Sequence, residues 1–86
     1  MKDKVIEIIG DSLNELSLRV DDVVYEKEGS NMFLRICLDS DEAIDINKIV
    51  LATKIINPLI DESSLINDKY ILDIYGKSKG DLNEEA

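Results

Sequence analysis

The alternating run over residues 32–39, MFLRICLD, constrains the fold of this chain more than any other segment. Large aliphatic side chains recur at every second position, at Leu34, Ile36 and Leu38. Successive side chains of a β-strand point to opposite faces, so this pattern predicts a strand with one face in the core. Cys37 falls on the opposite face, which we expect to be partly open. The run leads into an acidic turn and then an amphipathic helix, so a sheet must pack against a helix.

Two segments are predicted to be helical. Apolar residues recur at helical spacing over residues 3–16, although a glycine at position 10 weakens the middle of that pattern. Asp45 is a suitable N-cap for the second helix, because its carboxylate can accept hydrogen bonds from the first turn. We expect this helix to end near Ile56 or Asn57, because the residue before Pro58 is pushed out of the helical region. Residues 59–68 are then a connection.

Two more segments are predicted to be strands. Residues 18–27 are rich in valine, and residues 70–75 alternate like the central run. The adjacent residues Asp21 and Asp22 interrupt the alternation of the first strand, and a bulge there would allow Val23 and Tyr25 to share one face. The four residues that follow, EGSN, have the length and composition of a hairpin turn.

The order helix, strand, strand, helix, strand predicts an α+β domain with two layers, in which two helices cover one face of a three-stranded sheet. The third strand lies either beside the second, which makes a mixed sheet, or beside the first, which makes an antiparallel sheet. We favour the mixed sheet. Seven aliphatic residues are predicted to lie in the core: Leu34, Ile36, Leu38, Ile49, Val50, Leu72 and Ile74. Residues 1–76 form the predicted domain and residues 77–86 a polar, acidic tail.

Composition excludes several functional classes. The 86 residues carry a net charge of −9, include no histidine and contain one cysteine. Without histidine the chain lacks the commonest general base and metal ligand, so we expect no enzymatic activity, metal or cofactor. The ten basic residues form no cluster, so nucleic-acid binding through phosphates is not expected to dominate. No apolar run reaches the ~20 residues that span a membrane, and we expect a cytoplasmic protein.

The acidic turn is the candidate functional site. Asp39, Asp41 and Glu42 lie together between the central strand and the second helix. A calcium loop starting at Asp39 would need glutamate at its twelfth position, where Val50 stands, so we set the metal hypothesis aside. Two readings are left: a solvated helix cap, or a contact surface for a basic protein partner, which the turn would attract over a distance.

The order of elements and several short segments resemble the N-terminal domain of RimP, the bacterial ribosome maturation factor family. The first hairpin of that family is similar to residues 20–40, where Val23 and Tyr25 match an inward pair and Gly29 matches the turn. The family's second strand also ends in an aspartate and an acidic turn, as this chain does at residues 38–42. The family also carries a second, small β-barrel domain, which this sequence is too short to hold.

The resemblance implies a role in assembly of the small ribosomal subunit through contact with ribosomal protein and RNA. Ribosomal proteins are basic, so a basic ribosomal protein is the expected partner of Asp39, Asp41 and Glu42. The alternative is a structural or regulatory interaction domain that shares the fold without a ribosomal role, for example a homodimer formed through the face of the sheet that the helices leave open. The sequence leaves the oligomeric state open.

Overall fold

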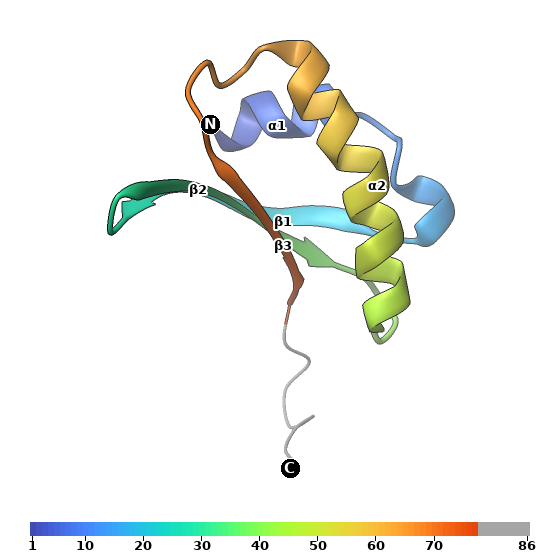
Figure 1. The fold of residues 1–86 in the computed structure, drawn as a ribbon. Coiled ribbons are helices and arrows are strands. Elements are labelled where there is room, and N and C mark those ends of the chain that lie inside the picture. The colour runs from blue at the N-terminus through green and yellow to red at the C-terminus, as the bar shows by residue number, and fades with distance from the viewer. Residues whose placement is uncertain (78–86) are drawn as a thin grey trace.

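The structure is a computed structural model that describes residues 1–77. Two helices lie on one face of a three-stranded sheet, as Figure 1 shows, which confirms the predicted α+β architecture. The elements in chain order are α1 (Lys2–Ile9), a short 3-10 turn (Asn14–Leu16), β1 (Arg19–Glu28), β2 (Asn31–Asp39), α2 (Ile46–Ser63) and β3 (Ile71–Gly76).

β1 and β2 form an antiparallel hairpin joined by two residues, Gly29 and Ser30. Gly29 has a φ of 63°, which fits a two-residue turn with glycine at its first central position. The register shifts between Val20 and Asp22, so the predicted bulge is confirmed. Beyond the bulge Val23 points into the core, because the extra residue restores the alternation that the two aspartates interrupt.

β2 is the central strand, and β3 pairs with it in parallel. The arrangement that we favoured from the sequence, a mixed sheet with the third strand beside the second, is therefore confirmed. Parallel neighbours need a long crossover connection, and α2 with its flanking loops provides it. The chain leaves β3 through Lys77, whose backbone N–H donates to the Leu38 carbonyl at 2.7 Å. The rest of the predicted tail, residues 78–86, lies outside the described residues.

The core lies between the sheet and the two helices. Leu34, Ile36 and Leu38 of β2 have no exposed surface, which confirms the predicted face of this strand. Fully burying an aliphatic side chain of this size contributes about 1.5–3 kcal/mol. Leu72 and Ile74 also pack against the core, but they are only partly buried, because β3 is an edge strand. Residues of both helices, of β1 and of the segment that precedes β1 complete the core: Val5, Ile9, Leu13, Leu18, Val23, Ala52, Ile56 and Ile60.

The prediction of one helix over residues 3–16 is wrong. α1 ends at Ile9, and Gly10 follows with φ 56° and ψ −130°, a conformation that side chains other than glycine rarely adopt. The chain changes direction there, and this turn still leads Leu13 into the core at 2% exposure. Val5, Ile9 and Leu13 of the predicted apolar pattern are buried, whereas Ile6 is 41% exposed. Glycine decided where the helix stops.

The predicted end of the second helix is also wrong. α2 continues through Pro58 to Ser63, so residues 59–63 belong to the helix rather than to a connection. Proline lacks the N–H that would bond the Lys54 carbonyl, but both residues lie on the exposed side, where water can satisfy that carbonyl. Ile56 and Ile60 are buried before and after Pro58, and their packing favours a continuous helix.

The buried stripe of α2 differs from the predicted one. Ala52, Ile56 and Ile60 recur every four residues and are fully or almost fully buried, whereas Val50 is 46% exposed. The prediction of Val50 as a core residue is therefore wrong, and Ile49 reaches the core only in part. Both residues lie beside the buried stripe, which begins at the small side chain of Ala52.

Candidate partner-binding surface

The acidic turn between β2 and α2 is fixed by hydrogen bonds within a few residues. The Ser40 backbone N–H donates to Asp39 Oδ1 at 2.8 Å, and the Glu42 N–H donates to Ser40 Oγ at 3.1 Å. Asp45 accepts from the Lys48 backbone N–H at 2.9 Å, so the predicted N-cap of α2 is confirmed. Ser40 is 1% exposed. These bonds hold the carboxylates of the turn on a rigid junction between a strand and a helix.

The three predicted site carboxylates have different surroundings. Arg19 lies between two of them, with its Nη2 atom 3.2 Å from Asp39 Oδ2 and 3.3 Å from Asp41 Oδ1. Asp39 is only 14% exposed, whereas the side chains of Asp41 and Glu42 are 92% and 71% exposed. The Asp39 carboxylate therefore joins the end of β2 to β1, and the other two carboxylates extend into solvent.

The charge of the turn is only partly neutralised. Glu42 Oε1 lies 3.5 Å from Lys48 Nζ, and Arg19 faces Asp39 and Asp41. Exposed ion pairs of this kind contribute little to stability and are screened by salt. A basic partner could therefore displace them at low cost, which makes the exposed carboxylates of the turn suitable for binding.

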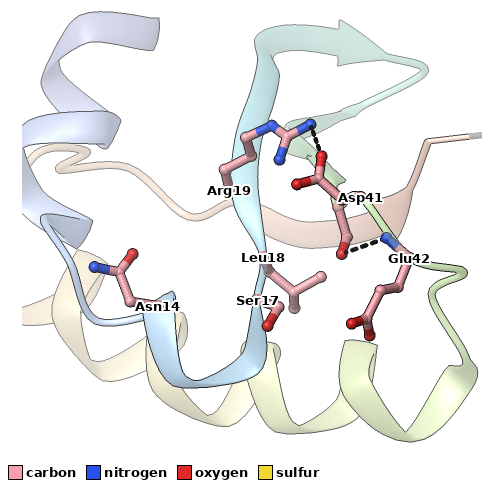
Figure 2. Close-up of a pocket in the computed structure, with 7 residues that line it drawn as sticks. Asn14, Ser17, Leu18, Arg19, Asp41 and Glu42 are labelled. Carbon is pink, nitrogen blue, oxygen red and sulfur yellow. Dashed lines mark hydrogen bonds and ion pairs between the residues drawn. The ribbon is translucent and has the colours of Figure 1, made fainter.

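A shallow groove of about 390 Å³ lies beside the turn. Figure 2 shows Arg19 reaching toward Asp41 on one side of it and Asn14 on the other. Leu18, at 3% exposure, is the apolar residue of its lining, and the other side chains are polar or charged: Asn14, Ser17, Arg19, Ser40, Asp41 and Glu42. Among residues 1–77, no three His, Cys, Asp or Glu side chains gather in a way that could hold a metal ion.

The face of the sheet opposite the helices carries a second polar cluster, which the sequence analysis did not predict. We call this surface the open face; its central row is Phe33, Arg35 and Cys37 on β2. The Arg35 guanidinium donates to carboxylates of both neighbouring strands, with Nη2 2.9 Å from Glu28 and Nε 3.2 Å from Asp73, and it also pairs with Glu26. It also lies 4.5 Å from the centre of the Phe33 ring.

The hydrogen bond with Glu28 raises the pKa of Arg35 above its ordinary value, so this cation is permanent at any relevant pH. The sequence offered one signal for the cluster: a two-residue turn fixes the hairpin register, which places Glu26 diagonally across from Arg35. Asp73 could not be found in this way, because nothing in the sequence sets the register of β3 against β2.

Cys37 lies on the predicted face of β2, but it is only 7% exposed rather than partly open. Its neighbours across the sheet are Asp22 and Tyr75, which flank the thiol on both sides. Burial raises the pKa of the Cys37 thiol, and the charge of Asp21 raises it further. A thiol held in its neutral form is a poor nucleophile, so Cys37 contributes packing rather than reactivity.

Comparison with known protein families gives a match to most of the chain. The model of the RimP N-terminal domain matches residues 8–76. The matched region begins within α1 and ends at the last residue of β3, so it contains the acidic turn and the open face. Within the described part of the chain, no helix is long and apolar enough to cross a membrane.

Proposed function

The chain belongs to the RimP N-terminal domain family, a family of ribosome maturation factors, and we propose that it binds a basic ribosomal protein of the small subunit during the maturation of that subunit. We propose that the contact includes Asp39, Asp41 and Glu42. The exposure of Asp41 and Glu42 on a rigid junction is the observation that supports this site.

Charge is the physical basis of the proposal. The chain carries a net charge of −9, and ribosomal proteins are basic, so long-range attraction would speed their encounter. Asp41 and Glu42 would meet lysine or arginine side chains of the partner directly. Asp39 would act through its charge while it keeps the turn in place by bonding Arg19 and the Ser40 amide.

The proposed role is non-catalytic and cytoplasmic, with residues 1–76 acting as the binding domain. Direct contact with ribosomal RNA is not proposed to dominate, because phosphate binding requires clustered basic side chains. The turn carries more carboxylates than cations: Asp39, Asp41 and Glu42 surround Arg19 and Lys48.

The test is a kinetic binding measurement with purified small ribosomal subunits at low and high salt. The variant Asp39→Asn/Asp41→Asn/Glu42→Gln removes the charge of the turn but keeps an oxygen that can accept from the Ser40 amide. We expect association several-fold slower at low salt, with a flatter salt dependence, because exposed charges act mainly on the encounter rate.

A matched control removes three exposed carboxylates elsewhere, with Asp3→Asn/Glu7→Gln/Asp11→Asn on and just after α1. Both variants change the net charge by the same amount, so a difference between them reports the location of the charge. Equal association rates for the turn variant and the control would overturn the assignment of the turn. If wild-type protein does not bind small subunits at all, the proposed function itself is wrong.

A further inference from the structure

The open face is an uncovered sheet surface of the described chain. Both helices lie on the other side of the sheet, and none of the described residues covers this one (Figure 1). Three large apolar side chains on it are markedly exposed: Val24 at 38%, Ile71 at 43% and Tyr75 at 43%. One of them comes from β1 and two from β3, so they flank the central row on both sides. Together with Phe33, which pairs with Ile71, they give this face several exposed or partly exposed apolar positions between its charges, as interaction surfaces often have.

The charges of the open face favour a basic occupant. Arg35 is surrounded by Glu26, Glu28 and Asp73, and Asp22 lies on the same face beside Cys37. Four carboxylates thus accompany the guanidinium, and Lys77 near Cys37 pairs with a further carboxylate, Asp21, so the surface is acidic although its central residue is a cation. Two copies of this chain would bring like charges together if they docked through this face.

The charges of the open face also disfavour nucleic acid as its binding partner. Phe33 and Tyr75 are aromatic residues on neighbouring strands of the open face, and such residues can stack on bases. However, Arg35 lies over the Phe33 ring and already donates to three carboxylates, which neutralise its charge. The carboxylates around it would repel the phosphate backbone.

The open face is continuous with the acidic turn. Alternate residues of β2 form one row that runs from Phe33 through Arg35 and Cys37 to Asp39, the first carboxylate of the turn. At about 3.3 Å per residue this row spans roughly 20 Å, which equals the length of an extended peptide of about six residues. A partner that reaches the exposed carboxylate of Asp41 therefore has a path onto the sheet.

We infer that the open face binds an extended, basic segment of the small-subunit protein, whose apolar or aromatic side chains pack separately on Val24, Ile71 and Tyr75 along its path. The inference rests on the proposed function and extends its contact surface from the turn to the sheet. The lysine or arginine side chains of the segment would lie near Glu26 and Asp73. The fixed Arg35 cluster would give the partner a surface that needs no rearrangement on binding.

The test compares two double variants in binding to purified small ribosomal subunits. Val24→Lys/Ile71→Lys replaces exposed apolar residues of the open face, and Ile46→Lys/Val50→Lys makes the same change on the exposed side of α2, where the residues are 72% and 46% exposed. Both variants add the same charge. We expect the open-face variant to bind at least about tenfold more weakly, mainly through faster dissociation, and the α2 variant to change affinity less than about twofold.

The outcomes distinguish failure of the proposed function from failure of the inference about the open face. Wild-type protein that does not bind small subunits overturns the proposed function and this inference with it. Wild-type binding that both variants retain equally overturns only the inference.

A dimer in solution that the open-face variant abolishes would assign this face to a second copy. Binding to protein-free small-subunit RNA that the same variant abolishes would assign it to RNA. If thermal unfolding shows that the open-face variant does not fold, Tyr75→Ala repeats the test with a single truncation, and unchanged dissociation overturns the inference.

Discussion

The two faces of β2 belong to one strand but differ in chemistry: one is apolar and buried, and the other is charged and partly exposed. On the covered face Leu34, Ile36 and Leu38 have no exposed surface and make no polar contact through their side chains. On the open face Arg35 makes three ion pairs and keeps 21% of its side chain exposed. The covered face supplies stability through burial, and the open face supplies a fixed pattern of charge. A single alternating sequence thus encodes both the core and a surface with a defined arrangement of charges.

Truncation on the covered face should have the largest effect. Ile36→Ala removes a fully buried side chain at the centre of the sheet and should lower the free energy of unfolding by about 2–5 kcal/mol. Urea denaturation monitored by circular dichroism measures this loss. An unchanged midpoint would show that burial on this face does not control stability, and the contrast between the two faces would disappear.

Loss of the Arg35 cation should have a smaller and salt-dependent effect. Arg35→Met keeps most of the side-chain length but leaves Glu26, Glu28 and Asp73 without their common partner. We expect a lower melting temperature than wild type, by less than Ile36→Ala lowers it, because the carboxylates left behind repel one another and stay hydrated. The difference from wild type should shrink at ~1 M salt, where charges are screened within about 3 Å. A difference independent of salt would mean that Arg35 acts by packing on Phe33.

Cys37 on the open face should make the free energy of unfolding depend on pH. Its pKa is raised by burial, so the folded state holds the thiol proton more tightly than the unfolded state. The resulting stability is present in full below the unfolded pKa of about 8.5 and is lost as the pH rises through the folded value. Unfolding measured from pH 8 to 10 should show a smaller loss for Cys37→Ala than for wild type. Parallel curves would contradict burial of the thiol in solution.

Substitution of an exposed apolar residue on the open face should have the smallest effect on stability. Val24→Lys alters a side chain that is 38% exposed and should change the free energy of unfolding by no more than about 0.5 kcal/mol, since such surface changes are usually neutral. Thermal unfolding checks this value. A large loss would indicate that the open face contributes to folding, which would blur the distinction between the two faces.

The covered face could be predicted from the sequence because a strand's alternation is local and strict. Leu34, Ile36 and Leu38 follow from the period of two alone, and Asp45 follows from the chemistry of a helix cap. The limits of the helices could not be predicted in the same way. Pro58 is a strong local stop signal, but packing of Ile56 and Ile60 across it decides the outcome.

The candidate site was predictable in composition but not in geometry. The clustering of Asp39, Asp41 and Glu42 is visible in the sequence, whereas the contact of Arg19 with the first two is not. Arg19 and Asp39 are 20 positions apart, and only the bulged hairpin register brings them together. The same limit applies to Arg35 and Asp73, whose contact depends on how the crossover connection aligns β3.

The mixed sheet also has a consequence for the order in which the chain folds. The β1–β2 hairpin closes through a two-residue loop, whereas the pairing of β2 with β3 joins residues such as Arg35 and Asp73, 38 positions apart. Closing the longer loop costs more chain entropy, and contacts of high sequence separation form slowly. We therefore expect the hairpin to gain protection from hydrogen exchange early in refolding and β3 to gain it late. The open face, which needs Asp73 and Tyr75 from β3, would then be completed only in the last step of folding.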